Sequence, residues 1–253
     1  MTARDSTEQR AAALWPMPPE LPRPAIMDQH WTDAVFLHWR VDNSVAARFM
    51  PPGVRPDDFD GSSWVGLIGF RMQRAGLGRG PAIPYLGSFN EVNVRLYSRE
   101  ADGTRGVVFL SLDANRLPAV LAARAAGIPY VWSRTSFQLP SSLRADTRTL
   151  RYSVKRYGQA SRSNFTVVPQ PAAPSDPLSV HLTARFGMHT RFGRRTLYVP
   201  NTHEPWPLRL AELHDLDDGL VAAAGIGVDG PPESVLYSPG VRTRFGRPRV
   251  VAE

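Results

Sequence analysis

The segment from Phe89 to Tyr97 constrains the fold most, because polar and apolar side chains alternate from Glu91 onward. Successive side chains of a β-strand point to opposite faces, so this pattern predicts a strand with two chemically different faces. The polar face carries Glu91, Asn93, Arg95 and Tyr97, and the apolar face carries Val92, Val94 and Leu96. The apolar face needs a core, and the polar face must meet either solvent or the wall of a pocket.

Other short segments rich in aromatic and β-branched residues predict further strands. They are Trp31–Val41, Ser63–Met72, Gly106–Leu112, Thr149–Tyr157, Asn164–Val168, Val180–Phe186 and Thr196–Val199. The chain has 24 Pro and 20 Gly among 253 residues, which favours many turns and few long helices. Because strands and helices do not alternate regularly, we expect a mainly β fold: an antiparallel sheet closed into a barrel or folded as a sandwich, with a few short helices.

Two helices are predicted within this β pattern. A short one follows the turn at 42–44 and runs through Phe49. A clearer one covers Ala119–Ala126, and Gly127 is a natural residue to end it. Asp113 and Asn115 lie where a strand gives way to this helix, so helix capping is their expected role.

Domain organisation is predicted to be simple. Residues 1–25 are polar and Pro-rich and predict a disordered lead-in, whereas 26–253 predict a single β-barrel domain. The first residues lack the apolar core of a secretory signal, and no segment is long and apolar enough to span a bilayer. A cytoplasmic protein without a membrane partner is therefore expected.

Composition narrows the possible chemistry. There is no cysteine, so a disulfide, a thiolate nucleophile and a thiolate metal site are excluded. The six histidines form no closely spaced ligand motif, so neither a metal nor another cofactor is predicted. The net charge is +7, but the basic residues are spread along the chain, which disfavours nucleic acid as a partner.

Several polar residues are candidates for a site. A buried Arg95 would anchor a carboxylate, and Glu91 in a pocket of low dielectric could act as a general acid or base. A strand face in contact with solvent is the alternative for these side chains. Arg124 lies in the predicted helix and Tyr130 just past it, so both could face either the barrel mouth or solvent.

The segment from His203 to Leu208 holds Trp206 between two prolines. Proline restricts its own backbone and that of the residue before it, so this path is rigid and extended. A rigid path suits a binding site that includes His203 and Trp206. It equally suits a structural plug in which the indole fills one end of a barrel.

Several phrases occur here in a fixed order: His38-Trp39-Arg40-Val41, Phe59-Asp60-Gly61, Trp64-Val65-Gly66, Phe89–Tyr97, Ser111-Leu112-Asp113-Ala114, Ile128-Pro129-Tyr130 and His203–Leu208. This series resembles the uncharacterised bacterial family typified by the YqjF proteins, over roughly Gln29 to Tyr237. That family is similar to a branch of the acetoacetate decarboxylase-like superfamily. The resemblance implies a mainly antiparallel β-barrel around a buried cavity, with Glu91 corresponding to the glutamate of the superfamily's polar strand.

The resemblance to the decarboxylases themselves includes a Gly-x-Pro segment, here Gly127-Ile128-Pro129. In those enzymes two adjacent lysines follow, and one of them forms a Schiff base with a keto acid. Here Tyr130 and Val131 follow, and Lys155 is the only lysine of the chain. Lys155 opposes the apolar side of its own predicted strand, so Schiff-base decarboxylation is not expected.

The sequence therefore predicts a barrel that binds a small keto acid or similar carboxylate. If it is an enzyme, it would be a lyase, isomerase or cyclase that uses acid–base chemistry. Glu91 and Tyr130 are the predicted catalytic residues, and the predicted substrate-binding residues are Asn93, Arg95, Tyr97, Arg124, His203 and Trp206. The alternative is a ligand-binding or accessory protein without catalysis, and a homo-oligomer is left open.

Overall fold

The computed structural model describes residues 18–21, 24–78, 80–81, 83–84, 87–139 and 148–252. The first strands are β1 (Met27–Val41), β2 (Val54–Pro56), β3 (Ser63–Leu77), β4 (Phe89–Glu100), β5 (Arg105–Ala114), β6 (Tyr130–Gln138) and β7 (Leu150–Arg156). They are followed by β8 (Arg162–Pro169), β9 (Gly187–Phe192), β10 (Arg195–His203), β11 (Arg209–Asp218), β12 (Ser234–Phe245) and β13 (Arg249–Val250). The short helices in these ranges are α2 (Asn43–Ala47), α3 (Leu117–Ala125), α4 (Pro177–Thr183) and α5 (Leu220–Ala223).

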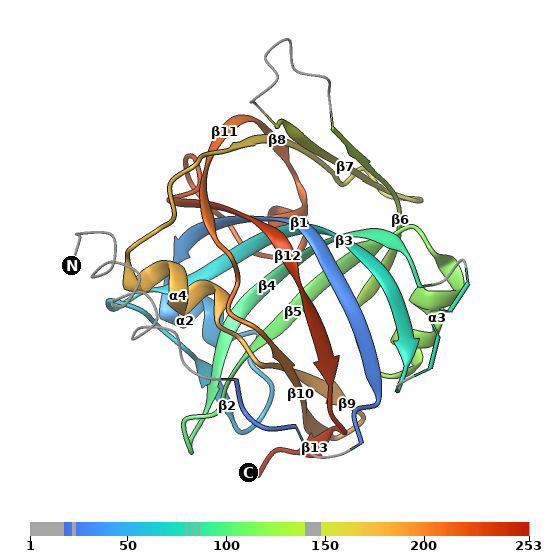
Figure 1. The fold of residues 1–253 in the computed structure, drawn as a ribbon. Helices are drawn as coiled ribbons and strands as arrows, with labels where there is room; N and C mark the ends of the chain where they lie inside the picture. Colours follow the sequence, from blue (N-terminus) through green and yellow to red (C-terminus); the bar gives the residue numbers. More distant parts are fainter. Residues whose placement is uncertain are drawn as a thin grey trace, which may run out of the picture.

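Strand pairing closes two rings that share five strands (Figure 1). The shared strands β12, β1, β3, β4 and β5 pair antiparallel in that order. From β5, the strands β6, β7, β8 and β11 lead back to β12 and close a nine-strand barrel. The strands β9 and β10 join β5 to β12 by a second route. The shared sheet therefore has an enclosed compartment on each of its two faces.

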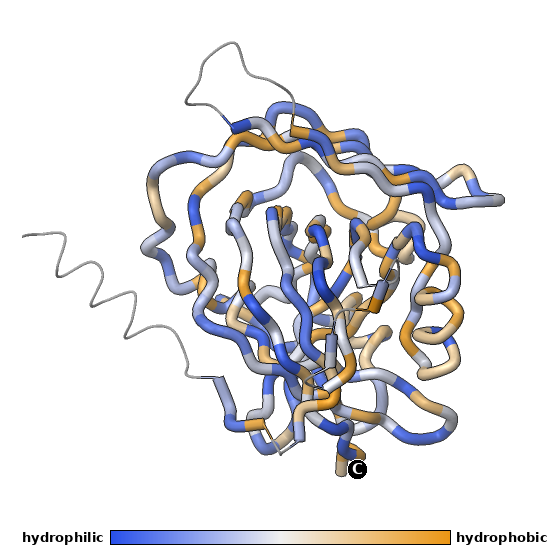
Figure 2. Tube along the Cα trace, turned by 45° about the vertical axis from the view of Figure 1, so that its right-hand side comes forward, coloured by the Kyte–Doolittle hydropathy of each residue, from blue (hydrophilic) through white to orange (hydrophobic). Residues whose placement is uncertain are grey.

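The nine-strand barrel is filled by apolar side chains. Its cluster includes Leu37 of β1, Val94 of β4, Tyr152 of β7 and Phe165 of β8, all fully buried. Tyr152 donates a hydrogen bond from its hydroxyl to the backbone oxygen of Asp33 at 2.8 Å, which satisfies the polar atom of this ring. We call this volume the apolar compartment. It contains the apolar face of β4. Hydrophobic and hydrophilic residues are interspersed along the chain trace (Figure 2).

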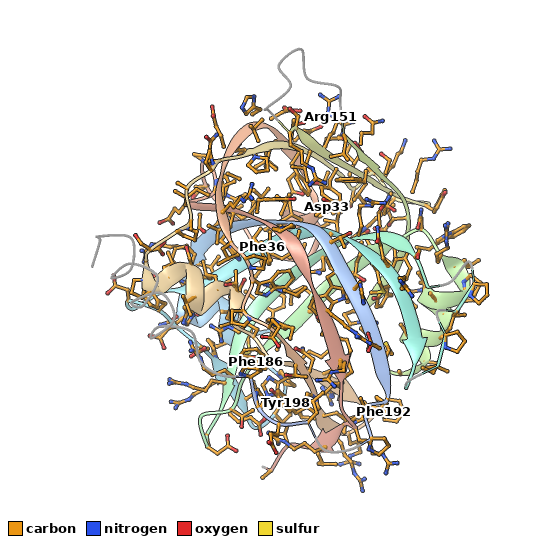
Figure 3. All side chains as sticks on the ribbon, viewed as in Figure 1. Asp33, Phe36, Arg151, Phe186, Phe192 and Tyr198 are labelled. Carbon is orange, nitrogen blue, oxygen red and sulfur yellow. The ribbon has the colours of Figure 1, made fainter. Side chains whose placement is uncertain are left out.

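The other face of the shared sheet is covered by β9, β10, α4 and the segment around Trp206. Two smaller apolar clusters lie here, one around Phe36 and Trp206 and one around Trp64 and Tyr97. Figure 3 shows Phe36 near the middle of the molecule, with Phe186 and Tyr198 below it and Arg151 of the opposite layer above it. We call this second volume the polar compartment, because buried polar and charged side chains lie between its apolar clusters.

The predicted architecture is confirmed: the fold is mainly β, closed into a barrel, with short helices. One predicted strand is wrong, because most of the segment Val180–Phe186 lies in or directly after helix α4. This helix begins at Asp176, whose side chain accepts a hydrogen bond from the backbone nitrogen of Ser179 at 2.8 Å, and Pro177 occupies its first turn. These local start signals outweigh the β-branched residues inside the segment.

Helix capping by Asp113 and Asn115 is also wrong. The residue before helix α3 is Arg116, and no side chain caps the helix. Asp113 is instead fully buried and paired with Arg156 of β7. Most of the predicted lead-in 1–25 lies outside the described residues, so the domain boundaries stay predictions. Among the described helices, none is long and apolar enough to cross a membrane.

Candidate functional site

The register of the shared sheet turns the polar face of β4 into the polar compartment. Phe36 of β1, Ile68 of β3, Asn93 of β4 and Leu112 of β5 are successive Cα partners across the sheet. Paired residues of neighbouring strands share a face, so these four side chains point the same way. The parallel pairing of Leu112 with Tyr130 adds the first residue of β6 to this row. Tyr130 therefore lies on the same side of the sheet as the polar residues of β4.

Glu91 and Tyr130 form a short, partly buried hydrogen bond. The Tyr130 hydroxyl donates to Glu91 Oε2 at 2.6 Å, and Asn93 Nδ2 donates to Glu91 Oε1 at 3.2 Å. Glu91 is 1% exposed and Asn93 is 2% exposed. The two residues that the sequence named as catalytic are thus brought into direct contact, although 39 positions separate them.

Burial sets the protonation of this pair. Removal from water raises the pKa of the Glu91 carboxyl from 4.5 to about 7, although the hydrogen bonds from Tyr130 and Asn93 act in the opposite direction. Burial, together with the neighbouring Glu91 carboxyl, raises the pKa of the Tyr130 phenol well above 10. Tyr130 therefore keeps its proton near neutral pH, whereas Glu91 exchanges its own in that range. A carboxyl that titrates near neutrality in a buried site is suited to general acid–base chemistry.

A second group of polar side chains surrounds Tyr97, further along β4. The Tyr97 hydroxyl lies 2.6 Å from His38 Nε2, and Arg95 Nε donates to the same oxygen at 3.3 Å. Arg95 Nη2 also donates to the backbone oxygen of Leu182 at 3.2 Å. The guanidinium of Arg185 lies over the Tyr97 ring, 4.9 Å from its centroid. Cationic groups therefore border both the edge and the face of this phenol.

Asp57 is the acidic member of this region. It accepts from Arg185, from Arg105 Nε at 2.7 Å, and lies 3.7 Å from Arg99 Nε. Burial would raise the pKa of the Asp57 carboxyl, but Arg185 and Arg105 outweigh burial and lower it. Asp57 is therefore charged near neutral pH and shared among three guanidinium groups.

Aromatic residues close the polar compartment opposite β4. Trp206 stacks on Trp31 at 6.0 Å between ring centroids and meets the edge of Phe36 at 5.2 Å. His203 lies 5.3 Å from Trp206 and is 3% exposed. Burial lowers the pKa of His203, so its imidazole is neutral near neutral pH. His203 and Trp206 are thus part of the packed wall, which matches both the site and the plug interpretations of this segment.

Arg124 lies apart from the other candidate residues. It is exposed on α3, and its Nε donates to the backbone oxygen of Tyr130 at 2.8 Å. Arg124 therefore supports the backbone that carries Tyr130 and does not line the compartment. Lys155 is exposed on β7, on the outer layer of the molecule, so the chain has no amine in the polar compartment.

An open groove of about 370 Å³ lies beside the polar compartment and does not include Glu91. Its lining residues are Arg71, Met72, Gln73, Arg74, Ser88, Phe89, Asn90, Asn115 and Arg116. Met72 and Phe89 also belong to the buried cluster around Phe36. These two apolar side chains therefore lie between the groove and the interior. Among the described residues, no three His, Asp or Glu side chains are grouped to hold a metal ion.

Sequence reasoning missed four residues of this region: His38, Asp57, His181 and Arg185. His38 could have been found, because alternation along β1 places it on the same side as Phe36. Asp57 lies in a turn-forming sequence that carries no sign of burial. His181 and Arg185 were hidden by the wrong assignment of their segment as a strand.

Comparisons with known proteins concern the family and the fold of this chain. The chain is 30% identical over 214 residues to the uncharacterized protein YqjF of Bacillus subtilis (strain 168), which covers 83% of this chain and 84% of that protein. Among solved structures, the enduracididine biosynthesis enzyme MppR with HEPES bound matches with a TM-score of 0.66 and 15% identity. That match covers 91% of this chain and 89% of MppR.

A second solved structure is an acetoacetate decarboxylase-like enzyme from Sphingomonas wittichii RW1. It matches with a TM-score of 0.64 and 13% identity, over 93% of this chain and 96% of that enzyme. At these identities the likeness concerns the fold, which is of the acetoacetate decarboxylase-like type. Residues 28–242 match the DUF2071 family of uncharacterized conserved proteins, and the chain belongs to this family, together with YqjF.

Proposed function

We propose that this protein binds a small keto acid or related carboxylate in the polar compartment and moves a proton of the bound ligand with Glu91 and Tyr130. The observation that carries the proposal is the 2.6 Å hydrogen bond between a buried carboxyl with a pKa of about 7 and a phenol that stays protonated. Such a pair can remove and return a proton near neutral pH. The fold supports a ligand-binding role, since MppR has been solved with pyruvate bound.

The proposed proton transfer uses only the residues of this chain. The Glu91 carboxylate takes a proton from the carbon next to the ligand's carbonyl, and the electron pair of the broken C–H bond forms an enolate. The protonated Glu91 then donates to the Tyr130 oxygen, which frees the Tyr130 hydrogen to bond to the enolate oxygen. Return of the proton to a carbon completes an isomerisation or exchange. A lyase or cyclase would break or form a carbon–carbon bond from the same enolate.

A Schiff base plays no part in this proposal. The only lysine, Lys155, is exposed on β7. Tyr130 follows the Gly-x-Pro segment where the decarboxylases have their first lysine, and here it contacts the acid–base carboxyl. Activation of the ligand therefore depends on hydrogen bonding to its carbonyl oxygen.

The position of Arg95 limits the length of a ligand that could contact both ends of the compartment. Glu91 and Arg95 are four residues apart on one strand, roughly 13 Å along it at about 3.3 Å per residue. The Arg95 guanidinium bonds to Tyr97 and Leu182, away from Glu91. A ligand that reaches Glu91 while its carboxylate meets Arg95 is therefore longer than a three-carbon keto acid.

Hydrogen–deuterium exchange tests the proposal directly. The protein would be incubated in D2O with pyruvate, 2-oxoglutarate, 2-oxoadipate and phenylpyruvate, and deuterium at the carbon next to the carbonyl would be followed by NMR. We expect protein-dependent exchange with one of the longer acids. Glu91→Gln should lower the rate at least 100-fold, and Tyr130→Phe about 10- to 100-fold, in the usual range for acid–base groups.

Glu212→Gln is a matched control, because it makes the same change at an exposed position where the glutamate side chain is 64% accessible. It should exchange protons at the rate of the unaltered protein. Equal rates in Glu91→Gln and the unaltered protein would contradict the proposal. Thermal stabilisation by one of these acids without any exchange would instead support the alternative of a non-catalytic ligand-binding protein.

A further inference from the structure

Three buried side chains around Tyr97 carry a nitrogen that has no hydrogen-bond partner within the described part of the chain. These atoms are His38 Nδ1, His181 Nε2 and Arg185 Nη2. The three residues are 0%, 6% and 4% exposed. Buried polar atoms in folded proteins nearly always have a partner, so three orphans in one region need an explanation.

The contacts of His181 show that its orphan nitrogen is a donor. His181 Nδ1 faces Nη2 of Arg105, and a guanidinium can only donate, so Nδ1 accepts. Burial and the nearby arginines lower the pKa of His181 to about 3, so its ring is neutral. A neutral imidazole has one N–H group, which must then be at Nε2. His181 therefore holds a buried N–H at Nε2 that makes no full hydrogen bond, although the Asp57 backbone acts on this ring and opposes the fall of its pKa.

The same reasoning applies to His38. Arg95 Nε donates to the Tyr97 oxygen, and His38 Nε2, 2.6 Å away, is the acceptor that the described residues offer to the hydroxyl hydrogen, so we assign that hydrogen to His38 Nε2. Burial, reinforced by Arg95, lowers the pKa of His38 well below 6.5, and the ring is neutral. The single N–H of His38 is then at Nδ1. All three orphan nitrogens are thus donors, since Arg185 can only donate.

Positive charge also exceeds negative charge in this region. Asp57 is shared by Arg99, Arg105 and Arg185. Arg95 makes no ion pair with the described residues, and the partners it has are a phenol and a backbone oxygen. Three guanidinium groups therefore share one carboxylate, and the guanidinium of Arg95 is paired with none among the described residues. A half-buried cation with neutral partners is stabilised when an anion binds beside it.

These groups converge on one aromatic ring. The distances from the Tyr97 ring centroid are 4.9 Å to the Arg185 guanidinium, 5.5 Å to that of Arg95, 5.8 Å to the His38 ring and 6.1 Å to the His181 ring. They come from β1, β4, α4 and the residues just after α4. Unpaired hydrogen-bond donors and excess positive charge are complementary to a negatively charged group that only accepts hydrogen bonds.

We propose that the cluster of His38, Arg95, His181 and Arg185 around Tyr97 is an oxyanion-binding site. It takes a carboxylate or phosphate group, and the two arginines supply charge while the neutral imidazoles supply N–H donors. If the proposed function holds, this group is the acidic end of the ligand whose reacting carbon lies at Glu91. The site itself depends only on the donors around Tyr97, so anion binding does not require chemistry at Glu91.

Titration with inorganic phosphate and, separately, acetate tests the site. The melting temperature and binding heat would be measured at fixed ionic strength, with chloride in place of the anion as reference. We expect one of the two anions to raise the melting temperature relative to chloride. Phosphate alone would identify a phosphate site, acetate alone a carboxylate site, and stabilisation by neither would overturn the proposal.

Two variants localise the binding. Arg95→Met removes a cation that makes no ion pair with the described residues, and His181→Phe replaces the imidazole by an apolar ring without a donor, so both are expected to fold. The dissociation constant for the anion should rise at least 10-fold in Arg95→Met and at least 3-fold in His181→Phe. Arg191→Met, which removes an exposed positive charge, should leave it unchanged.

Equal affinity in all three variants would overturn the proposal, because binding would then be nonspecific. Glu91→Gln separates this inference from the proposed function. It should bind the anion as the unaltered protein does, even though it loses proton exchange. Loss of exchange with retained anion binding supports both ideas, whereas anion binding without exchange in the unaltered protein supports the site alone.

Discussion

The two faces of the shared sheet enclose compartments of opposite character. On one face, β6, β7, β8 and β11 cover an apolar cluster whose main members are fully buried. On the other face, β9, β10 and α4 cover buried carboxyl, imidazole and guanidinium groups between smaller apolar clusters. Strand β4 contributes to both, with Val92, Val94 and Leu96 on one side and its polar residues on the other. One compartment is therefore a continuous apolar core, whereas the other holds buried polar groups between smaller apolar clusters.

The two compartments also differ in whether their buried charged and polar groups have partners. The apolar compartment contains one deeply buried ion pair, in which Arg156 donates to both carboxylate oxygens of Asp113 at 2.8 and 2.9 Å, and Ser133 adds a third bond. All of these charges are matched. The polar compartment instead holds unmatched donors around Tyr97 and a carboxyl at Glu91 whose pKa is raised. Unmatched polar groups cost stability, which is a common property of functional sites.

The largest effect is expected from breaking the matched ion pair of the apolar compartment. Arg156→Met would leave the fully buried Asp113 carboxylate without its partner, and we expect the free energy of unfolding to fall by about 3–5 kcal/mol. Urea denaturation would measure it. Arg162→Met is the control, because the Arg162–Asp217 pair is exposed and its loss should cost less than about 1 kcal/mol. Similar losses in both variants would contradict the view that Asp113 depends on Arg156.

A pair of substitutions at adjacent positions of β4 compares the two faces directly. Val94→Asn places an amide without a partner in the apolar compartment and should destabilise the fold by about 3 kcal/mol. Asn93→Val removes an amide whose Oδ1 lacks a partner and whose Nδ2 makes one 3.2 Å hydrogen bond to Glu91, so it should cost about 1 kcal/mol. Thermal or urea unfolding of both variants would show this. Equal losses of stability would mean that the two faces of β4 tolerate a change of polarity equally poorly.

The third effect depends on pH and concerns Glu91. Its pKa is about 7 in the folded protein against 4.5 ordinarily, so the folded state holds this proton more tightly. The resulting stabilisation is fully present below pH 4.5 and is lost as the pH rises through 7. Glu91→Gln has no proton to lose, so its stability relative to the unaltered protein should improve by up to about 3 kcal/mol between pH 4.5 and 8. Unfolding at several pH values would measure it.

Glu212→Gln provides the control for this pH dependence. Its side chain is exposed, so its substitution should leave the change of stability with pH as it is in the unaltered protein. A pH dependence of Glu91→Gln identical to that of the unaltered protein would show that Glu91 titrates normally. The carboxyl would then be accessible to water, and the central observation behind the proposed function would be lost.

Local patterns predicted much of the fold. The alternation in β4, the strands at Trp31–Val41 and Ser63–Met72 and the helix ended by Gly127 are all present, with β3 extended to Leu77. The two errors have different causes. The segment after Asp176 contains β-branched residues but starts with strong helix signals, so neighbouring residues could have shown that it is a helix. Asp113 resembles a cap but meets Arg156, 43 residues away, which neighbouring residues cannot show.

The candidate site divides in the same way. The sequence identified Glu91, Asn93, Arg95 and Tyr97 as one face because side chains alternate with a period of two along any strand. It could not show that Tyr130 bonds to Glu91, because this contact depends on the parallel pairing of β6 with β5. Nor could it show His38, His181 and Arg185 around Tyr97, since they come from two segments that lie far from Tyr97 in the sequence.

The sequence by itself therefore determined which residues of β4 share a face, and that Tyr130 and not a lysine follows the Gly-x-Pro segment. The tertiary structure alone decided which face of β4 lies against the apolar core and which lies in the polar compartment. The physical reason is that alternation is a property of a single strand, whereas enclosure depends on what the two rings place on each side of the sheet. Burial then raises the pKa of Glu91 and leaves the donors around Tyr97 unpaired, and neither effect exists in an isolated strand.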